Sequence, residues 1–241
     1  HKEGLAPDGN CRACVVEIAG ERTLAPSCCR SATPGMQVQT NSERAVKSQK
    51  MVLEMLLADL PEQGHKWLDD RAEAPHGELS QWAEHHGVQV RPQLAALQRE
   101  AVPADLSHPA MAVNLDACIQ CNRCERACRD LQVNDVIGLA FRGAHTQVVF
   151  DLADPMGGSS CVGCGECVQA CPTGALMPKS HMGPQKVDRE VDSVCPFCGV
   201  GCLVTYQVRD PDPTGAVPAR IVSVKGREGP ANEGRLCVKG R

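Results

Sequence analysis

Short apolar runs and turn residues alternate along the first forty positions. The run from Cys14 to Ile18 (Cys-Val-Val-Glu-Ile), followed by Gly20, is typical of a strand that enters a turn. Ahead of it, Pro7 to Asn10 carry a turn signal of their own (Pro-Asp-Gly-Asn). The sequence therefore predicts a segment of short strands and turns.

A helix is predicted next, because apolar residues recur at helical spacing from Ala45 to Leu60. Thr40 is expected to cap its N-terminus, with Glu43 at the third helical position as the second half of a capping box. Pro61 is expected to end it, since proline cannot supply the backbone donor that continues a helix. The apolar stripe indicates packing against neighbouring elements.

Two weaker helical patterns and one hairpin pattern follow. Residues 62–112 form a polar connector with helices expected at Glu78–His86, ended by Gly87, and at Gln93–Glu100. Much later, strand-like residues 203–208 and 220–224 flank a loop rich in proline and glycine. These last two runs predict a hairpin with a metal site at its base.

Composition changes this picture, because the chain has few large side chains with which to fill a core. Its 241 residues include Phe 3, Trp 2 and Tyr 1, against 22 glycines and 17 prolines. That balance favours several small domains held together by more than hydrophobic packing. The 16 cysteines are the obvious candidates, and their tight C-x2-C clusters favour metal centres over disulfides.

Charge and hydropathy bear on the partners. A net charge of −4 gives no strong basic field for nucleic acid. The longest apolar stretch, residues 51–60, is interrupted by Glu54 and Asp59 and is too short to cross a bilayer. We therefore expect no nucleic-acid partner, no membrane span and a cytoplasmic protein.

The strongest motif is an internal repeat of C-x2-C-x2-C-x3-C. It starts at Cys118 and again at Cys161, and Pro172 follows only the second copy. Three cysteines two apart wrap one face of a cubane cluster, and the fourth points to the other cluster. The spacing thus predicts two crossed [4Fe–4S] sites: Cys118, Cys121, Cys124 and Cys171; and Cys161, Cys164, Cys167 and Cys128. A zinc site would explain neither the third cysteine nor the repetition.

A third cysteine set lies near the end of the sequence. It comprises Cys195, Cys198 and Cys202, with Cys237 as a remote fourth member. Four thiolates in this pattern suit one [4Fe–4S] cluster or one zinc ion, and the neighbouring motifs favour the cluster. Gly199 and Gly201 would permit close backbone approach.

The N-terminal cysteines make an incomplete set. Cys11, Cys14 and Cys28 suit a [2Fe–2S] site, which needs a fourth ligand. Cys29 is interpreted as a buried or spare thiol, because neighbouring side chains do not readily face one cluster. His1 is the only other nearby candidate for the fourth position.

These motifs, in this order, resemble the N-terminal third of the catalytic subunit of soluble, NAD-dependent, molybdenum- or tungsten-containing formate dehydrogenases. The resemblance covers the whole chain, and its most specific parts are S-H-P-A-M-A-V-N-L-D-A-C-I-Q-C (107–121) and C-P-F-C-G-V-G-C (195–202). In that family the first [2Fe–2S] ligand precedes the C-x2-C pair by roughly eleven residues. The resemblance thus implies a missing ligand just before His1, and a polypeptide that continues past Arg241.

The resemblance also implies the wider enzyme. Formate would be oxidised to CO2 at a bis-molybdopterin guanine dinucleotide centre with Mo or W, beyond residue 241. Electrons would pass by way of Lys239, as a relay, to the cluster of Cys195 and its partners, and then through the ferredoxin pair. Diaphorase-type partner subunits carrying FMN and iron–sulfur clusters would reduce NAD+. No catalytic residue is visible in this chain.

An α+β chain of small iron–sulfur domains in series is the expected fold. Residues 1–39 would be part of a 2Fe-2S ferredoxin-like β-grasp domain, and residues 40–112 a helical connector. Residues 113–185 would be a bacterial-type 2[4Fe–4S] ferredoxin module. Residues 186–241 would be the β-hairpin 4Fe-4S start of a molybdopterin oxidoreductase domain.

Four other interpretations stay open. The iron–sulfur subunit of a respiratory NADH–quinone oxidoreductase shares the N-terminal domain, but it carries an H-x3-C-x2-C-x5-C site in the connector, and residues 30–117 contain no cysteine. An iron-only hydrogenase would show a T-S-C-C-P-type run where C-P-F-C-G-V-G-C stands. A stand-alone electron carrier and a zinc-binding scaffold complete the set, and metal analysis would separate the scaffold from the rest.

Overall fold

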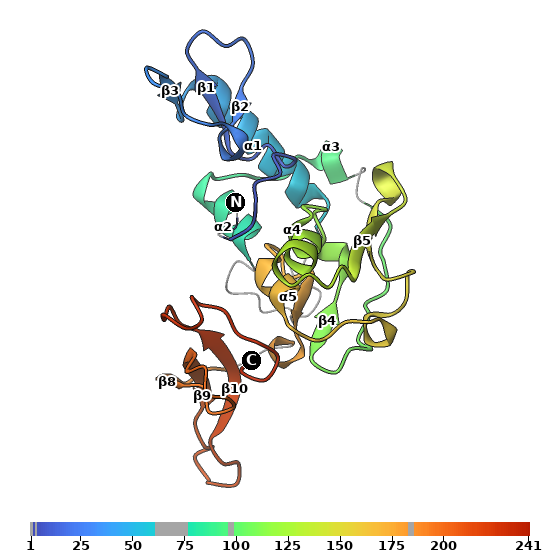
Figure 1. Ribbon diagram of the computed structural model, residues 1–241, viewed down its shortest axis with the longest axis vertical. Helices are drawn as coiled ribbons and strands as arrows, with labels where there is room; N and C mark the ends of the chain where they lie inside the picture. The colour runs from blue at the N-terminus through green and yellow to red at the C-terminus, as the bar shows by residue number, and fades with distance from the viewer. Residues whose placement is uncertain (1, 3, 61–76, 96–98, 183–185) are drawn as a thin grey trace.

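The computed structural model describes residues 2, 4–60, 77–95, 99–182 and 186–241. The molecule is elongated, and its parts follow one another along the long axis (Figure 1). A small sheet with helix α1 occupies one end, a mixed α/β body lies in the middle, and a second sheet occupies the other end. This agrees with the expected series of small domains of mixed α and β structure.

The N-terminal sheet is antiparallel, with β1 (Val15–Ile18) in the centre between β2 (Ala25–Pro26) and β3 (Val38–Gln39). Val16 and Ile18 of β1 are buried against Ala25 and form a small core with Met36. The predicted strand and the turn at Gly20, which has a positive φ of 84°, are confirmed.

Helix α1 runs from Glu43 to Ala58, as the apolar stripe predicts, but its start differs in detail. Ser42, not Thr40, is the N-cap, and its hydroxyl accepts a hydrogen bond from the amide of Ala45 at 3.3 Å. The capping box is therefore wrong, because Glu43 occupies the first helical position instead of the third. The helix ends before Pro61, which lies outside the described residues.

The connector contains two short helices, α2 (Glu78–His85) and α3 (Pro92–Ala95). Gly87 follows α2 with φ 58°, and the amides of Gly87 and Val88 donate back to the last turn, so the predicted end is confirmed. The second predicted helix is shorter than expected: α3 begins at Pro92, and residues 99–100 are not helical.

The middle body has an internally symmetric plan. Strands β4 (Met111–Val113) and β7 (Leu176–Pro178) pair antiparallel and bring its two ends together. The short helices α4 (Arg123–Arg126) and α5 (Glu166–Ala170) pack against each other. Each of these helices comes from one copy of the cysteine repeat, so the two copies meet face to face.

Between the two helices along the chain, β5 (Ile137–Ala140) and β6 (Gln147–Phe150) form a hairpin. The body has one main core, in which buried cysteines stand among aliphatic side chains. The core consists of Met111, Val113, Cys124, Cys128, Val136, Ile137, Val148, Phe150, Met156, Cys167, Val168 and Leu176.

The C-terminal sheet has three antiparallel strands in the order β10-β9-β8. Strands β9 (Leu203–Arg209) and β10 (Arg220–Gly226) form the predicted hairpin. Strand β8 (Arg189–Val194) pairs along the full length of β9 and was not predicted. All six of its residues are exposed, so it lacks the buried positions from which a strand is recognised in a sequence.

No helix in the described part of the chain is both long and apolar enough to cross a membrane.

Candidate metal centres

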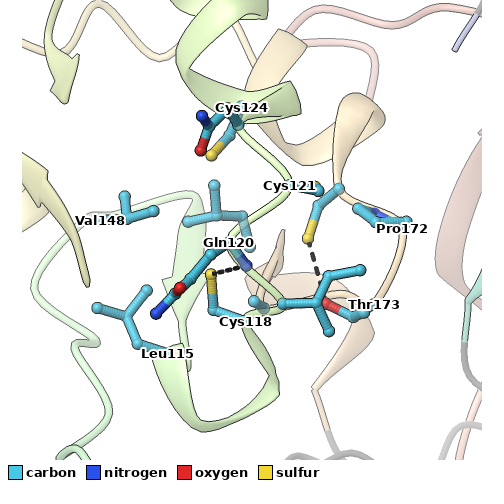
Figure 2. A pocket seen from close by; sticks show the side chains of 13 residues that line it. Leu115, Cys118, Gln120, Cys121, Cys124, Val148, Pro172 and Thr173 are labelled. Carbon is cyan, nitrogen blue, oxygen red and sulfur yellow. Dashed lines mark hydrogen bonds between the residues drawn. The ribbon is translucent and has the colours of Figure 1, made fainter. Parts of the chain in front are cut away.

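Four cysteines line one cavity in the middle body. Its walls include Cys118, Cys121 and Cys124 from the first repeat and Cys171 from the second, and its volume is ≈ 380 Å³ with the space open to solvent included. In Figure 2, Val148 and Leu115 lie on one side of the cavity and Pro172 and Thr173 on the other. The structure thus brings together the four cysteines that the repeat spacing assigns to one site.

A second cavity contains the complementary set. Cys161, Cys164 and Cys167 from the second repeat line it together with Cys128 from the first, within a volume of ≈ 330 Å³ that again includes open space. Its other walls are largely apolar, with Phe150 and Met156 among them. The crossing of one cysteine from each repeat to the other cavity is therefore a feature of the folded chain.

Local backbone geometry turns these thiols inward. Gln120 and Asn122 have positive φ values of 54° and 56°, and Gly163 and Gly165 have values of 70° and 82° at the equivalent places of the second repeat. Each loop therefore curls around its cavity. The amide of Gln120 donates to Cys118 Sγ, and that of Gly163 to Cys161 Sγ, both at 3.4 Å. Such amide donors favour negative charge on sulfur.

Burial raises the pKa of most of these thiols. The pKa of Cys121 rises to about 11, chiefly through burial, although the amide of Arg123 opposes the shift. Burial and the neighbouring cysteines raise the pKa of Cys124 and Cys167 further. Four thiolates could share such a cavity only around a strongly positive centre, and iron bound to thiolates supplies one. The donor set of each cavity therefore suits an iron–sulfur cluster.

The thiols of each set stand around a cavity and not at a common point. Within the residues that the structure describes, no three His, Cys, Asp or Glu side chains lie close enough to hold a single metal ion.

The third cysteine set lies where the C-terminal sheet meets the last turn of the chain. The amide of Cys195 donates to the carbonyl of Cys202 at 2.8 Å, which closes the loop between β8 and β9. Gly240 follows Cys237 in a turn, and a Cβ on Gly240 would lie 3.4 Å from Cys195 Sγ. Cys195, Cys202 and Cys237 are thus brought to one place, and Cys198 lies exposed on the loop between the first two.

At the N-terminal site, Cys14 and Cys28 interact directly. Burial opposes ionisation of Cys14, but hydrogen bonds from Cys28 and Ser27 outweigh it and lower its pKa. Burial and the same contacts raise the pKa of Cys28 to about 12. Cys11 is exposed on the loop before β1. His1 lies outside the described residues.

Cys29 is exposed, so its interpretation as a buried thiol is wrong. Its sulfur lies 3.7 Å from Cys28 Sγ, and a Cβ on Gly9 would lie 2.8 Å from it.

Lys239 is half-buried on the final turn, between the exposed Cys237 and the buried Gly240. Its relay role stays a prediction.

Two arginines near the cysteine sets were not singled out from the sequence. Arg123 forms a forked ion pair with Glu78 at 2.8 and 2.9 Å. Burial lowers its pKa, but the ion pair, Cys121 and Cys11 raise it, and the net direction is upward. Arg241 lies between the second cavity and the C-terminal set. Adjacency to a cysteine motif was the only sequence signal for either residue.

Three family models match successive parts of the chain. The 2Fe-2S iron-sulfur cluster binding domain matches residues 1–43, and the 4Fe-4S dicluster domain matches residues 117–175. The molybdopterin oxidoreductase Fe4S4 domain matches residues 188–241. Each cysteine set described above lies within one of these matches.

Two relatives are similar over nearly all of the chain. The second G-type component of the NADH-quinone oxidoreductase of Rhizobium meliloti is 33% identical over 98% of this chain and 26% of its own length. A Staphylococcus haemolyticus protein that carries the provisional name formate dehydrogenase is 24% identical over 100% of this chain and 27% of its own. The chain thus spans about a quarter of the length of the curated relatives it matches.

A solved structure shares the fold. One chain in the crystal structure of an NAD+-reducing [NiFe]-hydrogenase in the H2-reduced state superposes with a TM-score of 0.63 and 25% identity. The match covers 76% of this chain and 75% of that one.

Proposed function

Since the chain carries the iron–sulfur domains found in NADH-quinone oxidoreductase G-like, NAD-reducing hydrogenase and formate dehydrogenase subunits, we propose that it is the electron-transfer part of an NAD-dependent formate dehydrogenase. At a coarser level, it is an iron–sulfur electron-transfer module of the molybdopterin oxidoreductase type. The relatives of this module are subunits of multi-subunit complexes.

The observation that carries the proposal is the pair of cysteine-lined cavities. Each holds three cysteines from one repeat and one from the other, so each is a complete donor set for one [4Fe–4S] cluster. Cys195, Cys198, Cys202 and Cys237 would hold a third such cluster. Cys11, Cys14 and Cys28 would supply three ligands of a [2Fe–2S] cluster.

Bound clusters supply one-electron carriers, and the residues of this chain fix where each carrier stands. Buried cysteines and aliphatic walls keep water away from the two central sites, which reduces reorganisation when charge arrives. Amides such as those of Gln120 and Gly163 point at thiol sulfurs and favour the reduced, more negative state. No residue in the visible chain makes or breaks bonds of a substrate under this proposal.

The proposed route begins at the C-terminal set and ends at the N-terminal set. Formate oxidation would occur at a bis-molybdopterin guanine dinucleotide centre outside residues 1–241, with Lys239 as a relay. NAD+ would be reduced on diaphorase-type partner subunits that carry FMN. The order of the domains along the long axis in Figure 1 supports a single file of carriers.

Two features support formate as the substrate of the whole enzyme. The run C-P-F-C-G-V-G-C lies inside the match to the molybdopterin oxidoreductase Fe4S4 domain. Residues 30–117 contain no cysteine, so the connector lacks the additional cluster motif expected of a respiratory subunit.

A G-like component of NADH–quinone oxidoreductase is the second candidate. It is favoured by the higher identity of the Rhizobium meliloti relative, 33% against 24% for the named formate dehydrogenase. The two candidates predict different electron donors and acceptors for the complete complex.

The test uses the native complex purified under anaerobic conditions. We expect it to contain iron and acid-labile sulfide and to reduce NAD+ with formate. Cys198→Ala should remove one cluster and abolish that activity while formate still binds, and Cys29→Ala is the matched control that retains it. Normal formate-dependent NAD+ reduction by Cys198→Ala contradicts the proposal. NADH–quinone activity without formate oxidation favours the second candidate, and zinc without sulfide excludes both.

A further inference from the structure

The C-terminal turn and the second cysteine repeat meet at a defined contact. The amide of Leu236 donates to Gln169 Oε1 at 2.8 Å, which ties the turn to helix α5. Gly163 faces Val238, whose methyl carbon would lie 3.8 Å from a Cβ built there. The loop of the second cavity and the turn that carries Cys237 are therefore in contact, although more than sixty residues separate them in the sequence.

Arg241 lies in this contact. Its Nη2 donates to the carbonyl of Leu236 at 2.7 Å and lies 3.5 Å from the carbonyl of Gly165. A Cβ on Gly165 would lie 3.0 Å from the same Nη2, so only glycine leaves room for the guanidinium here. Both carbonyls belong to segments that carry cysteines, one in the second repeat and one beside Cys237.

The guanidinium interacts electrostatically with both cysteine sets. Burial lowers the pKa of Arg241, whereas Cys167, Glu166, Cys237 and Cys164 raise it. Arginine stays protonated in proteins, so a full positive charge lies between the two sites. Its Nε is buried and, among the described residues, has no hydrogen-bond partner. An unpaired buried donor of this kind is costly unless negative charge lies nearby.

We propose that Arg241 is a positioning and tuning residue for the junction between the cluster site of Cys161, Cys164, Cys167 and Cys128 and that of Cys195, Cys198, Cys202 and Cys237. Its hydrogen bonds hold the two sites in register, and its charge raises the midpoint potential of both. This inference rests on the proposed iron–sulfur function. One electron crossing the junction oxidises one site and reduces the other, while the guanidinium keeps its protons.

The sign follows from Coulomb's law. A reduced cluster carries one more negative charge than an oxidised one, and a nearby cation stabilises the reduced state. The effect is strong where water is excluded, as it is beside the buried Gly163 and Gly165. The cavity of Cys118, Cys121, Cys124 and Cys171 has no such interaction with Arg241 among those described, so it provides an internal reference.

The test is redox-poised EPR on the full complex, with signals assigned by single cysteine substitutions. Arg241→Gln should shift two midpoints to more negative potentials and leave the reference cluster unchanged. Arg241→Lys, which keeps the charge but not the fork, should restore most of the shift. Arg220→Gln removes one exposed arginine charge from strand β10 of the same domain and should move none of the three.

Three results would overturn the inference. One is an unmoved pair of midpoints in Arg241→Gln with its clusters intact. Another is an equal shift of all three clusters, which indicates a general disturbance. If Arg241→Gln loses iron, Arg241→Met repeats the charge test with an unbranched side chain. Loss of iron from both neutral variants but not from Arg241→Lys supports the role of the charge, and loss from all three, the third overturning result, shows a packing role only. Absence of any iron–sulfur signal in the wild type refutes the proposed function itself.

Discussion

At the scale of single residues, the ligand crossing is the most informative feature. Cys171 follows helix α5 in the second repeat, yet it lines the cavity of the first. Cys128 lies in the helical turn after α4 and lines the cavity of the second. A substitution at either position should therefore affect the cluster that belongs to the other motif.

Cys171→Ala should remove the cluster held by Cys118, Cys121 and Cys124, with a loss of about four irons per chain. EPR of the dithionite-reduced protein should then lack the same signal that Cys118→Ala lacks. Cys167→Ala is the matched control, because it comes from the same repeat but lines the other cavity. Identical spectra from Cys171→Ala and Cys167→Ala would show that the ligands are not crossed.

At the scale of elements, the connector is held to the first cluster site by a close backbone contact. Gly77 precedes helix α2 with φ 90°, and a Cβ on it would overlap the carbonyl oxygen of Pro172. The amide of Leu79 lies 3.4 Å from the same oxygen. The start of α2 therefore packs directly on the residue that follows Cys171.

Gly77→Ala should destabilise this contact for two reasons. Alanine is strained at positive φ by about 1 kcal/mol, and the clash with Pro172 adds roughly 1–3 kcal/mol. Gly87→Ala is the matched control, because Gly87 also has positive φ but has open space around it. Urea unfolding followed by cluster absorbance should show a clearly lower midpoint for Gly77→Ala than for Gly87→Ala. Equal midpoints would mean that α2 does not support the cluster site.

At the scale of the whole molecule, the central body depends on metal more than the sheets at either end do. Its core includes Cys124, Cys128 and Cys167, and the two repeats are joined by crossed ligands. The C-terminal sheet is held by two long antiparallel ladders between β8, β9 and β10. Ligand-to-metal bonds contribute directly to folding stability where a site is absent from the unfolded chain.

Removal of iron should therefore loosen the central body first. We expect amide protection across residues 111–178 to fall by at least about tenfold after anaerobic chelation, while strands β8 to β10 keep most of theirs. Hydrogen exchange with mass spectrometry measures both regions in one sample. Unchanged protection of residues 111–178 in iron-free protein would show that hydrophobic packing alone maintains the body.

The N-terminal segment also contributes to this arrangement. Leu5 packs with Ala127 and Ala170, one from each repeat, and Arg126 donates to the carbonyl of Ala6. The end of the chain marked N in Figure 1 accordingly lies beside α2 and the central body, away from the sheet that follows it. The exposed Cys11 is thereby brought within electrostatic reach of Arg123 and the first cavity.

The sequence by itself determined the local features. Cysteine spacing is a property of a few neighbouring residues, so it predicts both repeats and the partners within each set. Apolar periodicity likewise predicts α1, α2 and the β9–β10 hairpin, because each of these has a recognisable pattern of its own. The N-cap at Ser42 was missed because two candidates stand within one turn of each other, and only the backbone conformation selects between them.

Only the tertiary structure decided the long-range features. Strand β8 is exposed throughout, and it exists because β9 offers a hydrogen-bonding edge, which no local pattern reveals. The contact of Gly77 with Pro172 and the location of Arg241 between two cysteine sets join residues far apart in the chain. Such contacts depend on how separate elements pack, whereas metal-ligand spacing and helical periodicity are set by the chain itself.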